Sequence, residues 1–443
     1  MTGGDSISNN RILCSLIGLV GFLFIASLAY SVLKDNDPYK HFTGLGDTIS
    51  ISTDDTTIAF SYYKDGKEAI YTGNVDGKNV EKITEPEEKT DHRQPQFSPD
   101  GKGLIYVAAN PDGVQTIHYQ SDLTSDETRP LTGTDHHVFS TAFSPDGSTV
   151  YYIAMPAEDF QKPEGEKENG AELYSVDVKG NPPQKLTDKD SYAMNELSVS
   201  ADGENLYYTA FRDKKEQLFS YNLETGTEQP FLEEHTSDGV YHPAFSPNED
   251  FLAYTAVADT SENGTFQYGL YLMDLSSGES TRLTDYNASV TSPVFFHQED
   301  RIALLVESNW PSEPSSYEVM TVSYDGKEAA PIELDLPESE NDIQLKAIAD
   351  NVVNPLTMTV LYLLLFGLLT VYFHKASQKT YFPAKLSAIL SGIVFASSFA
   401  GAAYNGWAGI GLFMIAVWLF VCTAVLFLFA FVYRWFVRRS TLP

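Results

Sequence analysis

The stretch QPQFSPDGKGLIYVA, residues 94–108, combines a tight turn with a short apolar run. A Ser-Pro-Asp-Gly sequence favours a reversal of the chain, and runs of β-branched and aromatic residues favour strands. Variants of this stretch recur along the chain: ISTDD at 51–55, FSPDG at 97–101 and 143–147, VSADG at 199–203, FSPNED at 245–250 and FFHQED at 295–300. The chain is therefore built from an internal repeat.

The spacing of the repeat predicts the architecture. Its second position falls at residues 52, 98, 144, 200, 246 and 296, and a hydrophilic tract at 158–170 accounts for the longest step. Each turn is followed by an apolar run such as LIYVA (104–108), and a second pair of strand-like segments comes later in each unit. Four short antiparallel strands in each of six units predict an all-β six-bladed propeller. The alternative, an elongated β-solenoid, would have shorter repeats.

The repeat also resembles a known family. The F-S-P-D-G turn, the L-x-Y that follows it and the Leu-Thr pair that closes several units are similar to the TolB-type family of WD-like propeller repeats. The Leu-Thr pairs are Leu131-Thr132, Leu186-Thr187 and Leu283-Thr284. The same repeat occurs in the propellers of prolyl-oligopeptidase and dipeptidyl-peptidase relatives. The resemblance covers about 49–334, with the first and last copies departing from the pattern. It implies a toroid that binds proteins or peptides, and it implies no reaction.

The two ends of the chain are apolar and differ in this from its acidic middle. Four apolar stretches, at 12–33, 353–373, 386–404 and 408–433, are long enough to cross a bilayer, which takes about 20 residues. Basic residues flank them on one side if the middle of the chain lies outside the cell: Arg11, Lys375, Lys379, Lys385, Arg434, Arg438 and Arg439. We expect a multi-pass cell-membrane protein with cytoplasmic termini and an external propeller. A signal peptide cleaved near Ser27-Leu28-Ala29 is the alternative for the first stretch.

These observations predict four parts of the chain. They are a cytoplasmic stub and transmembrane helix at 1–34, the propeller at 40–335, an acidic linker at 336–352, and three transmembrane helices with a basic tail at 353–443. The cysteines, Cys14 and Cys422, both fall in predicted spans, so the propeller is expected to fold without a disulfide.

Charge restricts the partners. The net charge is −31, and all but one of the 60 acidic residues lie between 35 and 350. Nucleic acid is excluded as a partner because its phosphates require basic patches. The acidity is interpreted as an adaptation to a salty or alkaline habitat, with a basic partner as the alternative.

Candidate ligand-binding residues precede the innermost strands and are expected at one mouth of the channel. They are His92, Arg93, His136, His137, Asn195, Glu196, Tyr241 and His242. Histidine with carboxylates there could hold a transition metal, which the sequence does not identify. The alternative is that these histidines are solvated in loops or pin neighbouring blades by hydrogen bonds. Calcium at the acidic turns is a further alternative, although turn chemistry alone accounts for those aspartates.

Known catalytic signatures are absent from the sequence. It contains no G-x-S-x-G, C-x-x-C, H-E-x-x-H or G-x-x-x-x-G-K motif. We therefore expect a protein without enzymatic activity or cofactor that recognises a protein, a peptide or an envelope component. Two alternatives stay open: a metal-dependent enzyme acting at the channel mouth, and a structural subunit of a membrane complex.

Small residues recur every four positions along the third apolar stretch. Ala384, Ala388, Gly392, Ala396 and Ala400 would form a stripe that lets helix backbones approach closely. We expect this stripe to pack against another span of the same chain, with docking onto a separate membrane protein as the alternative.

Overall fold

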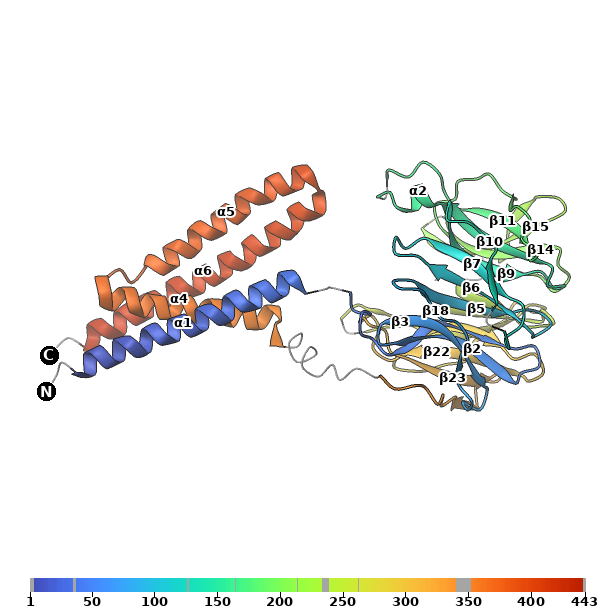
Figure 1. Ribbon diagram of the computed structural model, residues 1–443, viewed down its shortest axis with the longest axis horizontal. Coiled ribbons are helices and arrows are strands. Elements are labelled where there is room, and N and C mark those ends of the chain that lie inside the picture. Colours follow the sequence, from blue (N-terminus) through green and yellow to red (C-terminus); the bar gives the residue numbers. More distant parts are fainter. Residues whose placement is uncertain are drawn as a thin grey trace. The chain divides into compact units, whose positions relative to one another are not determined.

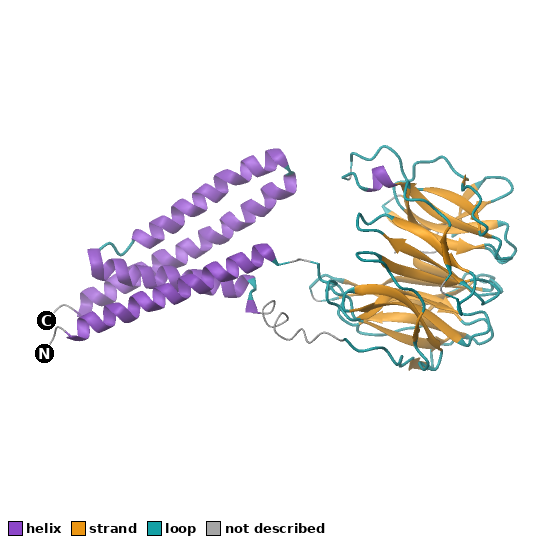
Figure 2. Cartoon of the chain, in the orientation of Figure 1, coloured by secondary structure: helices purple, strands orange, loops and turns teal. Residues whose placement is uncertain are grey.

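The computed structural model describes residues 4–34, 37–125, 127–163, 165–212, 214–232, 239–261, 263–339 and 352–440. The chain forms two compact units, one of residues 37–341 and one that joins residues 1–36 to residues 342–443. The first consists of strands with one short helix, and the second consists of helices (Figure 2). Most of the expected linker at 336–352 lies outside the described residues.

The unit of strands is a six-bladed β-propeller, as the repeat predicted (Figure 1). Each blade is a four-stranded antiparallel sheet built from consecutive strands. The first three blades are β1 (Gly44–Ile51), β2 (Thr57–Lys64), β3 (Lys67–Asn74) and β4 (Glu81–Lys82); β5 (Asp91–Phe97), β6 (Leu104–Ala109), β7 (Gln115–Gln120) and β8 (Thr128–Pro130); and β9 (His136–Phe143), β10 (Thr149–Pro156), β11 (Glu172–Asp177) and β12 (Gln184–Lys185). The last three are β13 (Met194–Val199), β14 (Asn205–Arg212), β15 (Lys215–Asn222) and β16 (Glu228–Pro230); β17 (Tyr241–Phe245), β18 (Phe251–Thr260), β19 (Phe266–Asp274) and β20 (Ser280–Arg282); and β21 (Ser289–Phe295), β22 (Arg301–Glu307), β23 (Tyr317–Ser323) and β24 (Ala329–Pro331). The short helix α2 (Ala157–Phe160) lies in the hydrophilic tract of the third blade.

The repeated turn has a shared hydrogen-bond pattern. In the second blade the Ser98 hydroxyl donates to Asp100 at 2.6 Å, while the Gly103 N–H donates to Ser98 Oγ at 3.0 Å. The same pair of bonds forms at Ser144 and Asp146 in the third blade. Hydrogen bonds from Ser144, the largest cause, and from Ser148 lower the pKa of Asp146 to about 2. The turn aspartates thus have local partners that explain them without calcium.

The propeller core lies between blades. Each cluster of buried apolar side chains joins two neighbouring sheets, because one sheet cannot bury both of its faces alone. One cluster, for example, combines Ile105 of the second blade with Val150 of the third, and both are fully buried. Stacking of the blades therefore provides the stability of the toroid.

The first strand of each blade lines the axis of the toroid. Strand β1 contacts β5 and β21, and β13 contacts β9 and β17. In every blade the pairing of this strand with the second strand has a register shift of the β-bulge type. A bulge re-aims the side chain of the extra residue, so the inner wall carries a ring of redirected residues.

The helical unit contains four long apolar helices, one N-terminal and three C-terminal, as predicted. They are α1 (Gly4–Leu33), α4 (Pro355–Ser377), α5 (Phe382–Tyr404) and α6 (Gly406–Ser440). All four are long and apolar enough to cross a membrane. Helices α5 and α6 pack along each other, and α1 contacts α4.

Of the small-residue stripe on α5, Ala384 is buried and the four later residues are exposed. Ala388, Gly392, Ala396 and Ala400 are exposed, and nothing lies within 4 Å of a Cβ placed on Gly392. The buried residues of α5 are Pro383, Ala384, Ser387, Ser391 and Ser398. The packing face within the chain is therefore the neighbouring, serine-rich side of the helix. There the Ser391 hydroxyl donates to the Ala416 carbonyl at 3.1 Å, and Ser387 shares hydrogen bonds with Tyr362 and Thr423.

Candidate ligand-binding channel

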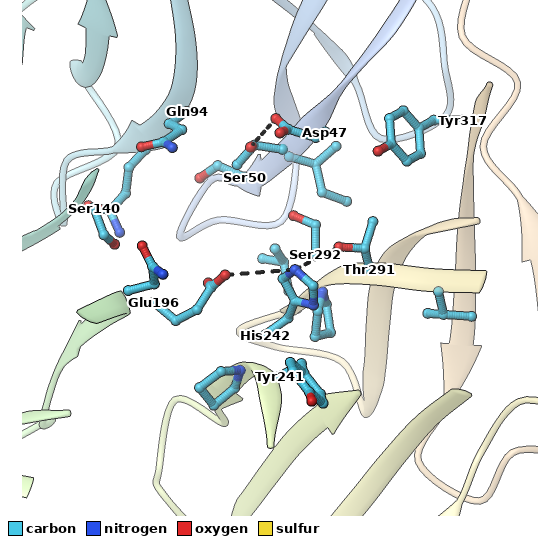
Figure 3. Close-up of a pocket in the computed structure, with 18 of the residues that line it drawn as sticks. Asp47, Ser50, Gln94, Ser140, Glu196, Tyr241, His242, Thr291, Ser292 and Tyr317 are labelled. Atoms are coloured by element: carbon cyan, nitrogen blue, oxygen red, sulfur yellow. Dashed lines mark hydrogen bonds and ion pairs between the residues drawn. The ribbon is translucent and has the colours of Figure 1, made fainter. Parts of the chain in front are cut away.

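A cavity of about 600 Å³ occupies the centre of the propeller (Figure 3). Residues from all six blades line it, and those at the bulges of the first strands form a ring. One residue from each blade lies four positions before the second position of its repeat: Thr48, Gln94, Ser140, Glu196, His242 and Ser292. The fold thus converts a position in the sequence repeat into a ring of polar side chains around one space.

Backbone conformation helps to place this ring. Gln94, Glu196, His242 and Ser292 have positive φ values between 48° and 56°. This region is costly for residues other than glycine and persists where the surrounding structure enforces it. Three of the four are followed by proline. Proline has no backbone N–H, so it fits a bulge, where a hydrogen bond between the strands is already interrupted. The bulges therefore combine a strained residue with a rigid one at the channel wall.

Four of the expected site residues meet at this cavity. Asn195, Glu196, Tyr241 and His242 all line it. Figure 3 shows the Glu196 carboxylate turned toward the His242 ring, where Oε1 lies 3.7 Å from Nε2. The same ring lies 3.1 Å from Thr255 Oγ1 through Nδ1 and 3.1 Å from Thr291 Oγ1 through Nε2. His242 is thereby held between the fifth and sixth blades, next to a carboxylate from the fourth.

The other four expected residues do not line the cavity. All eight residues that were expected to bind a ligand lie in the first strands of their blades, whereas the sequence analysis expected them before those strands. His92 and His137 are buried, and burial lowers the pKa of each to about 4. His136 lies 2.8 Å from its neighbour Asp135. That these four residues contact a ligand stays a prediction.

His137 and Arg93 instead connect neighbouring parts of the ring. The Gln115 N–H, in the second blade, donates to His137 Nδ1 at 3.2 Å, and the His137 ring stacks on Phe160 of α2 with centroids 3.5 Å apart. Arg93 pairs with the buried carboxylate of Glu68, in the first blade, at 2.9 Å. Pinning of blades was one of the alternatives drawn from the sequence, and these contacts have that geometry.

Several residues of the cavity escaped the sequence analysis. Asp47, Glu307, Trp310 and Tyr317 line it from the first and sixth blades. Those blades are the two whose repeats depart most from the pattern, and none of these four residues lies at the ring position four residues before the second position of the repeat. For the ring itself a signal was present, namely the fixed offset of four residues before each repeat turn. Among the described residues no group of three or more His, Cys, Asp or Glu side chains converges to hold a metal ion.

Comparisons with known proteins agree with the fold. No protein-family model matches the sequence. Over 181 residues, 40% of this chain, it is 25% identical to the uncharacterized peptidase YuxL of Bacillus subtilis, and the match spans 24% of that protein's length. TolB from Acinetobacter baumannii superposes with a TM-score of 0.51 at 17% identity, over 64% of this chain and 65% of TolB. TolB-type propellers are thus among the structural neighbours, and this likeness shows the fold alone.

One expectation is corrected by these comparisons. The absence of a known catalytic motif led to the expectation that the protein is not an enzyme. The matched relative in Bacillus subtilis is described as a peptidase, and that finding overturns the expectation. The reason is that a motif search detects only catalytic machinery of known pattern, whereas a propeller also occurs in proteins that act on what they bind. Enzymatic activity is therefore open for this chain.

Proposed function

We propose that this protein is a membrane-anchored propeller that binds a protein, a peptide or an envelope component in its central channel. The observation that carries the proposal is the ring of polar side chains, one from each blade, around a cavity of about 600 Å³. Ligand sites are typically concave and of this size, with a few convergent polar groups. The likeness to TolB in fold supports the proposal.

The anchoring part of the proposal rests on the four apolar helices and their flanking charges. Basic residues concentrate at the cytoplasmic ends of membrane spans. The propeller then lies outside the cell and both termini lie in the cytoplasm. Protease added to intact cells tests this orientation: it should degrade the propeller and leave a tag at either terminus protected. Degradation of the tags in intact cells would contradict it.

Binding is tested with the full chain purified in a mild detergent. Proteins and peptides that copurify are identified by mass spectrometry for the parent chain and for His242→Ala, which removes a side chain from the channel wall. We expect a partner retained by the parent and lost by the variant. Glu204→Gln, an exposed residue in the turn after β13, is the matched control. A partner retained equally by all three proteins would place recognition elsewhere and favour the structural-subunit alternative.

The same samples serve to test turnover. Because a relative is described as a peptidase, peptides recovered with the parent chain are compared before and after incubation. New fragments that depend on His242 would add a reaction to the binding role. The binding test is independent of this measurement, because it records only whether a partner copurifies with the chain.

A further inference from the structure

The charges at the cavity wall have one sign. Asp47, Glu196 and Glu307 contribute three carboxylates from the first, fourth and sixth blades. Among the described residues that line the cavity there is no lysine or arginine. Like charges in a cleft with walls of low dielectric reinforce each other's potential and attract positively charged ligands.

Two hydrogen-bond acceptors at this wall have no partner. Glu307 is 5% exposed, and its Oε1 atom has no hydrogen-bond partner among the described residues. The same holds for Oε1 of Gln96, which also lines the cavity. A buried acceptor left unsatisfied is costly, more so when it belongs to a carboxylate. Both groups could be satisfied by N–H donors of a bound molecule.

Glu307 has a defined place in the sheet. It pairs in register with Ser289 on one side and with Tyr317 on the other, and all three residues line the cavity. Burial, the largest cause, and the nearby Asp47 both raise the pKa of Glu307, and a hydrogen bond with Ser315 opposes them. A positively charged group beside it would offset both effects.

Aromatic rings form the adjacent wall. Tyr241 and Tyr268 meet edge to face with centroids 5.3 Å apart, and Tyr268 meets Trp310 in the same way at 6.2 Å. Trp310 is 43% exposed, while its indole N–H donates to the Phe266 carbonyl at 2.9 Å and so holds the ring in place. The faces of aromatic rings attract organic cations, most strongly when water is excluded.

We propose that the channel recognises a cationic group of a peptide, either a lysine or arginine side chain or a free amino terminus. The carboxylates come from three separate blades and do not converge as metal ligands do, so a molecule with several N–H donors fits them better than a single ion. This inference rests on the proposed function, because it names the ligand chemistry of the same cavity.

The test uses the full chain in neutral detergent micelles and isothermal titration with four peptides. Acetyl-Ala-Lys-Ala-amide and acetyl-Ala-Arg-Ala-amide present side-chain cations, Ala-Ala-Ala-amide presents a free amino terminus, and acetyl-Ala-Ala-Ala-amide is neutral. We expect at least one cationic peptide to bind and the neutral peptide not to bind. Which cationic peptide binds identifies the source of the charge.

Two variants assign binding to the wall. Glu307→Gln keeps the shape and removes a buried charge, so it should fold, and it should weaken binding by about tenfold or more. Trp310→Leu should also weaken binding, through loss of the ring face. Glu204→Gln changes the net charge equally at an exposed turn and should bind like the parent. Equal weakening by Glu204→Gln would reveal attraction to the acidic surface in general and would overturn the inference.

The outcomes separate this inference from the proposed function. Binding of the neutral peptide as tightly as the cationic ones would overturn the inference. If no cationic peptide binds while a copurifying partner is still lost in His242→Ala, the inference fails and the proposed function stands. If neither peptides nor a partner depend on the channel, both fail.

Discussion

The Asp55 carboxylate joins the first blade to the last, where its Oδ1 atom accepts a hydrogen bond of 2.8 Å from the backbone N–H of His297. Its Oδ2 atom accepts a second one, of 2.7 Å, from the N–H of Gln298. Asp55 occupies the turn position that Gly101 and Gly147 hold in other blades, and it keeps their positive φ at 59°. The departure from the repeat at this position is thus a device that helps to close the ring.

Closure also involves the segment after β24. No strand is exchanged between the first and last blades among the described residues. The Asp335 N–H instead donates to the Gly77 carbonyl at 2.8 Å, and the Tyr62 hydroxyl donates to the Pro337 carbonyl at 2.6 Å. Ring closure therefore depends on hydrogen bonds and on the apolar cluster between these blades.

We predict that Asp55→Gly destabilises the propeller by about 2–4 kcal/mol. The change removes two backbone hydrogen bonds and the contact with His297 Nδ1 from a side chain that is 7% exposed, while glycine accepts the positive φ. Thermal unfolding of the full chain in detergent measures the effect. The matched change is Glu249→Gly at the same turn position of the fifth blade. There one carboxylate oxygen accepts from the Ala201 N–H at 2.8 Å, so the loss should be smaller, about 1 kcal/mol. Equal losses would contradict a special role of Asp55 in closure.

Glu68 should make stability depend on pH near neutrality. Burial raises its pKa to about 7, against an ordinary value of 4.5, although Arg93 opposes this shift. The folded state therefore holds a proton that the unfolded chain releases, and stability from this group is lost as the pH rises from about 4.5 through 7. Relative to Glu68→Gln, which does not titrate, the parent chain should lose stability over this range. Parallel unfolding curves of the two proteins across that range would refute the prediction.

His137 should have the opposite dependence. Its pKa is lowered to about 4 by burial, so the unfolded chain binds a proton at a higher pH than the folded one. Stability from this group is lost as the pH falls from about 6.5 toward 4. Protonation at Nδ1 would also remove the acceptor for the Gln115 N–H. His137→Gln should reduce the loss of melting temperature between pH 7 and pH 5. An undiminished loss would place the acid sensitivity in other residues, such as His92 and His118, whose pKa values are also lowered.

Two adjacent residues of α5, one buried and one exposed, allow a matched pair of substitutions in the helical unit. Ser391 is buried and bonded to Ala416, whereas Gly392 has open space around it. Ser391→Leu should weaken the packing of α5 on α6 and reduce protease resistance in detergent, because it removes the hydroxyl that donates to the Ala416 carbonyl. Gly392→Leu should be tolerated in the isolated protein. A loss of copurifying membrane proteins in Gly392→Leu alone would support docking through the small-residue stripe.

Much of the architecture was predictable because it is local. The Ser98 and Asp100 pair forms its turn with neighbours two to five residues away, so six such turns can be counted without a structure. The apolar helices were predictable for the same reason, since length and composition decide them. The contact face of α5 was not predictable in this way. Small residues at Ala388 and Gly392 permit close packing, but the neighbours that α5 meets are chosen by the whole bundle.

Some residues of the candidate site were also predictable from the local sequence, and others were not. Glu196 and His242 lie four residues, and Asn195 and Tyr241 five residues, before the second position of their repeats, so the spacing of the repeat was enough to find them. Glu307 and Trp310 were missed because they follow no such position. They line the cavity from the end of β22 and from the loop that follows it.

The sequence by itself determined the number of blades, the strand pairs within each blade and the four apolar helices, because turns, strand runs and hydropathy act over a few residues. Only the tertiary structure decided that Asp55 closes the ring, that His137 accepts a hydrogen bond from Gln115 of the second blade instead of lining the cavity, and that carboxylates and aromatic rings from several blades surround that cavity. These relationships join residues from different blades, and their distances are set by the closure of the toroid as a whole.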